Sequence, residues 1–250
     1  MGSWISYGLG TENANLPGFV VLVPALPISG ESPMWSSAFP PAIHQGTLVH
    51  NAWVDGEVFD AKKAMPNLSN PARQANLQNA ELGFLGKLDK MQHSKDLEME
   101  ASIRSMEIAY RMQTEAPNVF DISKESKTVL DMYGPGSPAL DCLMAVRLIE
   151  KGVRMVQLYH GKNDPFDSHN DIMQHVNAVR EGDRAYAAVI KDLKQRGLFE
   201  ETLVVCVPSS GARLRCKHRT PRRMVRSSTA AIRMDVAFRS GWPAPGSRKD

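Results

Sequence analysis

The stretch between residues 153 and 207 constrains the fold most, because it holds two apolar runs separated by a polar loop and an amphipathic pattern. The run at 153–159 has the composition of a strand, and the run at 203–207 is typical of a short buried strand. Between them, 171–196 places apolar residues at helical spacing, and Gly197 follows as a helix stop signal. This order of strand, loop, helix and strand predicts a right-handed βαβ unit with parallel strands.

The first 70 residues have a different character, because they are rich in Gly, Pro, Ser and Asn. One short run, at 19–23, has strand-like composition, and closely spaced prolines follow it. We therefore expect an irregular segment that is draped over the core.

Helical patterns begin near Pro71, which suits the first position of a helix. A second helix is predicted over 97–114, and Pro117 is expected to end it. A third is predicted over 140–150, with Gly152 placed as the residue just beyond its C-terminus.

Charge is distributed unevenly along the chain. Residues 211–250 hold nine Arg and two Lys against two Asp and no Glu, a net charge of +9, whereas residues 1–210 carry a net charge of −6. Such a break usually marks a tail or a domain boundary.

The 42% apolar content is enough for a core, and no apolar run reaches the length of a transmembrane helix. The N-terminus has no secretory signal pattern, so the sequence as written predicts a cytoplasmic protein.

The polar loop at 160–170 follows a predicted strand, and ligands of open α/β sheets bind beyond the carboxyl ends of strands. Asp167 and His169 are two residues apart there, and His175 follows six residues later. Carboxylate and imidazole are common ligands of zinc, iron and manganese, so these three residues are candidate metal ligands. The same stretch also suits a polar turn, in which Asp171 caps the following helix and His175 caps it or faces solvent.

Several longer segments add a resemblance to these patterns. They are MGSWISYGLGTENANLPGFVVL at 1–22, WSSAFPPAIHQGT at 35–47, SMEIAYRMQTEAP at 105–117, YG at 133–134, CLMAVRLIEKGVRMVQLYHG at 142–161 and DLKQRGLFEETLVV at 192–205. In this order they resemble the bacterial domain-of-unknown-function family 1501, a relative of sulfatases and alkaline phosphatases whose members are often exported.

The resemblance implies a partial sulfatase- or alkaline-phosphatase-like α/β fold, with a mostly parallel sheet and flanking helices. The family's W-D-x-H motif aligns with Phe166-Asp167-Ser168-His169, which implies that Asp167 and His169 bind metal; His175 is a weaker third candidate. The implied cofactor is a divalent metal (Zn, Ca, Mg or Mn) with an incomplete ligand set. The implied activity is metal-dependent hydrolysis of a small sulfate or phosphate ester, with no catalytic residue identified.

The sequence departs from the family pattern after residue 205. Family members continue with W-G-G-E-F-G-R-T-P and later G-R-D-H, whereas this chain reads CVPSSGARL at 206–214. Codons for C-G-A-E-F-G-R-T-P can be chosen so that losing one guanine from the second codon gives C-V-P-S-S-G-A-R-L. We therefore expect a frameshift near Cys206. The family also carries a portion before MGSW, so we expect residues 1–207 to be an incomplete domain and 208–250 a basic, disordered or non-native tail.

Two other interpretations stay open. The chain could be a catalytically inactive fragment or pseudogene product, because one Asp-x-His pair supplies few ligands for a tight catalytic site. Alternatively, the arginine-rich stretch at 213–226 could bind anions electrostatically, although it holds no recognised nucleic-acid motif and no interleaved aromatic residues.

Overall fold

The computed structural model describes residues 1–11, 13–24, 35–50, 75–92, 97–160, 171, 173, 175–208 and 232–239. The helices among them are α1 (Gly2–Leu9), α3 (Ala75–Gln92), α4 (Leu97–Phe120), α5 (Lys127–Tyr133), α6 (Ser137–Glu150) and α7 (His175–Gln195). Short 3₁₀ segments are η2 (Ala42–His44), η3 (Ile122–Lys124) and η5 (Phe199–Glu201). The strands are β1 (Phe19–Val23), β2 (Thr47–His50), β3 (Met155–Tyr159), β4 (Thr202–Pro208) and β5 (Ile232–Arg239).

These strands form one five-stranded sheet in the order β2-β1-β3-β5-β4. β1 pairs in parallel with both β2 and β3, while β5 is antiparallel to β3 and to β4. β4 therefore runs in the same direction as β3. The predicted α/β class, with parallel strands flanked by helices, is confirmed.

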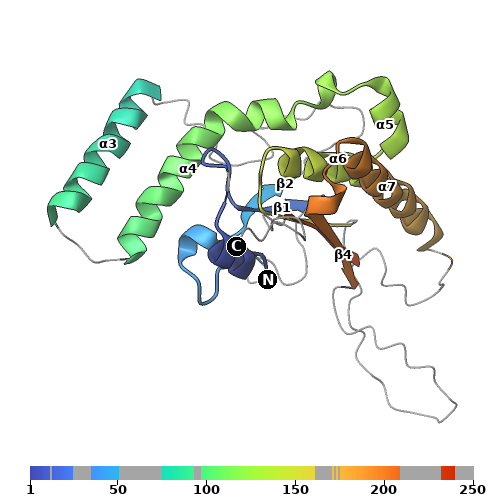
Figure 1. Ribbon diagram of the computed structural model, residues 1–250, viewed down its shortest axis with the longest axis horizontal. Coiled ribbons are helices and arrows are strands. Elements are labelled where there is room, and N and C mark those ends of the chain that lie inside the picture. Colours follow the sequence, from blue (N-terminus) through green and yellow to red (C-terminus); the bar gives the residue numbers. More distant parts are fainter. Residues whose placement is uncertain are drawn as a thin grey trace, which may run out of the picture.

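The core lies on both faces of β1 and β3, whose residues are all buried. Alternate side chains such as Val20 and Val156 pack against α6 and α7, and those of the opposite parity, such as Val21 and Met155, form a second cluster that Ile5 of α1 joins. In Figure 1, α6 and α7 lie above the strands and α1 lies below them. The prediction of an irregular segment draped over the core was thus wrong for β1, which is an inner strand of the sheet.

The predicted βαβ unit is present with one change. β3 and β4 flank α7 in sequence and run in the same direction, but β5 lies between them in the sheet. β5 falls within residues 208–250, for which the sequence predicted a disordered or non-native tail; the rest of that tail beyond Pro208 lies outside the described residues. The division at residue 207 itself stays a prediction.

Glycine ends both helices that pack on the buried face. After α6, Gly152 has φ 84°, and the Val153 N–H reaches back to the Leu148 carbonyl at 3.0 Å. After α7, Gly197 has φ 71°, and the helix is closed in the same way. Only glycine adopts this conformation without a steric cost, so both predicted stops are confirmed.

α4 continues through Pro117 to Phe120, so the prediction that this proline ends the helix was wrong. Proline removes one N–H donor, yet the last turn is held by burial, since Val119 and Phe120 are 0% and 2% exposed. The guanidinium of Arg147 also donates to the carbonyls of Asn118 and Val119, at 2.9 and 2.7 Å. These bonds satisfy carbonyl groups that a helix end leaves without partners.

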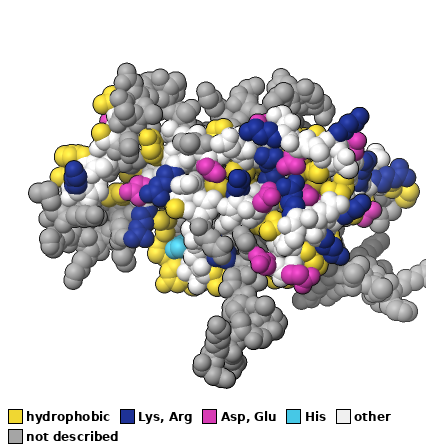
Figure 2. All heavy atoms as spheres, turned by 45° about the horizontal axis from the view of Figure 1, so that its top comes forward, with side chains coloured by type: hydrophobic (Ala, Val, Ile, Leu, Met, Phe, Trp, Pro, Cys, Tyr) yellow, Lys and Arg dark blue, Asp and Glu magenta, His cyan; other side chains and the backbone are white. Residues whose placement is uncertain are grey.

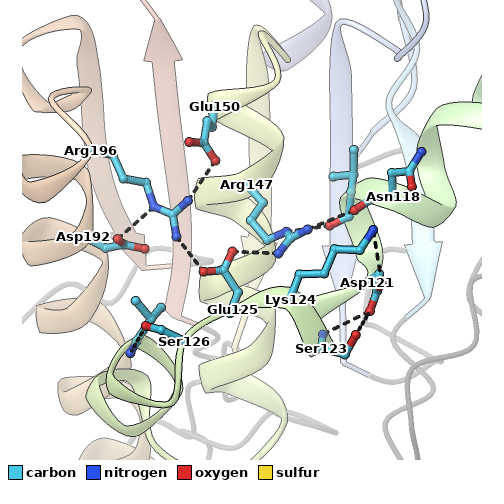
Figure 3. A network of polar contacts seen from close by, with 12 residues as sticks. Asn118, Asp121, Ser123, Lys124, Glu125, Ser126, Arg147, Glu150, Asp192 and Arg196 are labelled. Atoms are coloured by element: carbon cyan, nitrogen blue, oxygen red, sulfur yellow. Dashed lines mark hydrogen bonds and ion pairs between the residues drawn. The ribbon is translucent and has the colours of Figure 1, made fainter.

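An ion-pair network joins η3, α6 and α7 where the two helices end (Figure 3). Arg196 donates to Asp192 at 2.9 Å, to Glu150 at 2.8 Å and to Glu125 at 3.2 Å. Glu125 also accepts from Arg147 at 2.7 Å. Burial opposes the charged form of Arg196, but the hydrogen bond to Asp192 and the neighbouring carboxylates outweigh it and raise its pKa. The network therefore links the C-terminal ends of α6 and α7 to the segment after η3.

The α3–α4 hairpin extends sideways from the sheet (Figure 1). Along the described helices, none is both long enough and apolar enough to cross a membrane. On the face that Figure 2 shows, Lys and Arg side chains are interspersed with Asp and Glu. That face has no large surface of a single charge sign.

Candidate functional site

The parallel strands direct their carboxyl ends to one edge of the sheet. β1 ends at Val23, β2 at His50 and β3 at Tyr159, and β4 ends at the same edge because it runs the same way. In α/β sheets this edge is where ligands bind. We call it the carboxyl edge, and the opposite one the amino edge.

The loop that carries the candidate ligands begins and ends at the carboxyl edge. Asp167 and His169 lie in 161–170, outside the described residues, so their role stays a prediction. The structure does describe residues on both sides of this segment: His160 directly follows β3, and Asp171 lies shortly before α7, whose first residue is His175. The loop therefore runs from an inner strand of the sheet to the start of the helix that covers it.

Asp171 and His175 differ in how the structure places them. The Asp171 carboxylate accepts a hydrogen bond from the Met173 N–H at 2.9 Å. Because α7 begins at His175 and not at Asp171, this bond caps the turn that leads into the helix. His175 is half-buried in the first turn of α7. Asp171 therefore caps the turn before α7 and not α7 itself, and the role of His175 as a metal ligand stays a prediction.

His160 is a residue of this edge that the sequence patterns did not single out. It is 3% exposed, and its Nε2 lies 3.1 Å from the carbonyl oxygen of Ala178 on α7. Its ring meets that of Tyr186 edge-on, with centroids 5.8 Å apart. Burial lowers the pKa of His160, and the hydrogen bond to Ala178 and the charge of Glu181 oppose this shift in part. The ring is therefore fixed between strand and helix, and its burial favours the neutral form.

A second histidine with a hydrogen-bonded side chain lies at the amino edge. His44 precedes β2, and its Nδ1 lies 3.0 Å from the Ser6 hydroxyl. Burial lowers the pKa of His44 as well. Nearby, a cavity of about 390 Å³ opens between α4 and the segment before β2, and its lining includes Ile108 and Thr47. Both features lie at the opposite end of the strands from His160.

The donor types of the three candidates suit a divalent metal. Asp167, His169 and His175 would offer one carboxylate and two imidazoles, and three protein ligands are the number found in catalytic zinc sites. Among the residues that the structure describes, no group of three His, Cys, Asp or Glu side chains is placed to hold a metal ion. Any such site would therefore need at least one ligand from outside the described part of the chain.

Comparison with known proteins identifies the family. Residues 1–211 match the family described as "Protein of unknown function (DUF1501)". The chain belongs to the DUF1501 family. No curated protein and no solved structure matches it. The DUF1501 match takes in β1 to β4 and the candidate loop, whereas β5 lies beyond it.

Proposed function

We propose that this DUF1501 protein binds a divalent metal at the carboxyl edge through Asp167, His169 and His175, and that the site serves hydrolysis of a sulfate or phosphate ester. The observation that supports the proposal is the position of the loop. The loop is preceded by His160, which directly follows the inner parallel strand β3, and it is followed a few residues later by His175, the first residue of the helix α7 that covers this strand. A loop at this place is where α/β proteins bind their ligands.

The roles within the site follow from the donor chemistry. The Asp167 carboxylate and the imidazoles of His169 and His175 would hold the metal, the imidazoles in their neutral form. The bound metal would stabilise the charge that develops on the ester oxygens. We assign no nucleophile to this chain, so metal binding and hydrolysis are tested separately.

Metal analysis of the purified full chain tests the binding step. We expect about one equivalent of zinc, manganese, calcium or magnesium after loading and desalting, and a loss of that metal in His169→Ala and Asp167→Asn. His44→Asn is the matched control, because His44 is at the amino edge; its metal content should equal that of the wild type. Absence of bound metal in the wild type, or full retention in His169→Ala, would contradict the proposal.

Hydrolysis of aryl sulfates and aryl phosphates by the loaded protein separates the remaining interpretations. Turnover that His169→Ala abolishes supports an esterase. Metal binding without turnover supports a chain that keeps the metal site and has lost activity.

Anion binding by the arginine-rich stretch needs its own variant. Since β5 pairs with β3 and β4, deleting residues 211–250 would remove a strand of the sheet. Replacing the arginines between 213 and 226 by Gln leaves β5 in place. Loss of binding to heparin on this change, with metal content intact, would support an anion-binding function.

We further propose that the chain is read in a different frame after about Cys206. The family match extends only five residues beyond this position, to 211, and the arginine-rich composition begins there. Sequencing of the gene decides the matter. If no alternative frame after codon 206 encodes E-F-G-R-T-P, the proposal is wrong.

A further inference from the structure

We propose that a second copy of this chain binds to an exposed aromatic face that α1 and the segment 35–44 form, which gives a dimer with two-fold symmetry. The exposed apolar side chains of this aromatic face are those of Met1, Trp4, Tyr7 and Phe39. The proposal goes beyond the metal site and does not depend on it, because dimer formation through these residues needs no bound metal.

α1 directs its small side chains to the sheet and its large ones to solvent. Gly2, Ser3 and Ser6 are its buried residues, whereas Trp4 and Tyr7 are 53% and 54% exposed. A helix that covers a protein core normally does the opposite and buries its apolar stripe. The reversed arrangement leaves large apolar side chains in water, and burial by a partner would remove that cost.

Two hydrogen bonds fix α1 in this orientation beside the segment 36–44. The Ser3 hydroxyl donates to the Ser36 carbonyl at 3.0 Å. One turn further along, the Ser6 hydroxyl lies 3.0 Å from Nδ1 of His44. Rotating the helix to bury its large side chains would break both contacts. The helix and the segment therefore present one continuous surface below the sheet, on the side away from α6 and α7 (Figure 1).

Phe39 is held in solvent by an unfavourable backbone conformation. Its side chain is 92% exposed, and the preceding residue, Ala38, has φ 55°. A residue with a Cβ enters this left-handed region at a cost of about 1–2 kcal/mol. The turn thus costs free energy through its backbone and through its exposed ring, and strain of this kind occurs mainly at functional sites. Burial of Phe39 by a partner would offset both costs.

The aromatic side chains of α1 are ordered before any partner binds. The rings of Trp4 and Tyr7 meet edge-on with centroids 6.2 Å apart, and Tyr7 meets His44 in the same way at 5.3 Å. Side chains that are already fixed lose little conformational entropy on association. Trp and Tyr are also the residue types that most often dominate the binding energy of an interface. We therefore expect Trp4 and Tyr7 to be anchors of the dimer.

The area of the aromatic face suits the centre of a stable interface. A Trp, Tyr or Phe side chain buries about 150–250 Å². At their exposed fractions, Trp4, Tyr7 and Phe39 together offer about 300–500 Å² for burial on each copy. A standard interface buries about 800 Å² on each partner. The three rings alone would therefore supply about half of that area.

The lack of charge favours a second copy as the partner. Residues 1–11 and 35–50 contain no Asp, Glu, Lys or Arg. In a two-fold dimer each face meets its own copy, so a charged face would repel itself, whereas a neutral aromatic face is compatible with itself. Helices that bind anionic membrane surfaces carry Lys and Arg, which these segments lack. Interface centres are likewise rich in aromatic residues and Met and poor in charge.

Sedimentation of the full chain over a range of concentrations tests the proposal. We expect the wild type to reach twice the chain mass of 27.6 kDa. Trp4→Ser and Phe39→Ser should each raise the dissociation constant about 10-fold or more, the effect of losing an anchor residue. Phe84→Ser is the matched control, because Phe84 is 61% exposed on α3; it should leave the dissociation constant unchanged.

The proposal is overturned if the wild type stays monomeric at about 100 µM, or if Phe84→Ser weakens the dimer as much as Phe39→Ser does. Binding of a monomeric wild type to neutral phosphatidylcholine vesicles, lost in Trp4→Ser, would also overturn it and would identify a lipid surface as the occupant of the aromatic face.

A charge swap at Tyr7 separates a lost contact from a folding defect. Tyr7→Lys and Tyr7→Glu each bring like charges into an interface between identical faces, so each variant alone should be monomeric. A mixture of the two variants should recover the mass of a dimer, because opposite charges then meet. A mixture that stays monomeric, while the wild type is dimeric, would show that the two aromatic faces do not bind one another.

Discussion

Replacement of Arg196 by Met offers the sharpest test of how the helical layer is held. Arg196 contacts three carboxylates, and the burial of each decides what its loss costs (Figure 3). The Asp192 side chain is 2% exposed, that of Glu125 is 14% exposed and that of Glu150 is 46% exposed. The pair with Glu150 is solvent-screened, so its loss contributes little. The cost therefore arises mainly at the two buried carboxylates.

The substitution leaves Glu125 and Asp192 with different remaining partners. Glu125 keeps Arg147, whose Nη1 lies 2.7 Å away. Asp192 keeps a neutral donor, the Tyr133 hydroxyl at 2.9 Å. A buried charge that loses its cation costs about 3–5 kcal/mol, and the remaining hydroxyl places Arg196→Met near the lower end, about 3 kcal/mol. At an m value of about 2 kcal/mol/M, the urea midpoint falls by about 1.5 M.

Urea unfolding followed by circular dichroism measures this loss. The matched control is Arg111→Met, because the Arg111–Glu107 pair is 4.0 Å apart and its side chains are 47% and 43% exposed. That control should change the free energy of unfolding by less than about 0.5 kcal/mol. Adding Asp192→Asn to Arg196→Met should recover part of the loss, since the neutral amide is cheaper to bury unpaired. Equal midpoints for Arg196→Met and Arg111→Met would refute the reasoning.

Two further outcomes follow from backbone conformation and from buried histidine. Gly134→Ala should cost about 1–2 kcal/mol of unfolding free energy, because Gly134 has φ 90° and a Cβ there would lie 2.9 Å from the Arg184 side chain. Gly197 has φ 71°, but a Cβ there would meet open space, so Gly197→Ala should lower the free energy of unfolding less than Gly134→Ala does. A lower urea midpoint for Gly197→Ala than for Gly134→Ala would contradict this. Burial lowers the pKa of His160 below 6.5, so the unfolded chain takes up the proton first and stability falls as pH drops below about 6.5. In His160→Gln, urea midpoints between pH 7.5 and 5.5 should therefore decline less steeply than in the wild type, and an unchanged slope would exclude this origin.

Local signals in the sequence predicted the helical layer well. Gly152 and Gly197 were identified as helix ends, and both adopt the positive φ that glycine allows. Such signals depend on a few neighbouring residues, so the sequence shows them directly. The course of α4 through Pro117 was not predicted, because it depends on Arg147, thirty residues later, which donates to carbonyls in the last turn of that helix.

The sheet could be predicted only in part, because strand pairing also depends on residues that are far apart in the sequence. The strand-like runs at 19–23 and 203–207 were visible, but composition does not say which strands are neighbours. The position of β5 between β3 and β4 is set by pairing across long stretches of sequence. Its local sequence, in an arginine-rich segment, gives no sign of an inner strand.

His160 was missed because a single histidine after an apolar run has no distinctive spacing. A signal did exist in Gly182, a glycine inside a strongly amphipathic helix. Glycine at such a position indicates either a weakened helix or a close approach by another group. Here the structure shows the second case, since a Cβ at Gly182 would lie only 3.1 Å from Cε1 of His160.

The contacts at the two ends of α7 lie at opposite edges of the sheet. α7 begins at the carboxyl edge, where His160 contacts Ala178, and ends at the amino edge, where Arg196 joins the ion-pair network. Eighteen residues of helix separate these contacts, a length of about 27 Å. Groups this far apart with no shared partner affect stability independently. The ion pairs therefore stabilise one end of α7, while the hydrogen bond between His160 and Ala178 stabilises the other end independently.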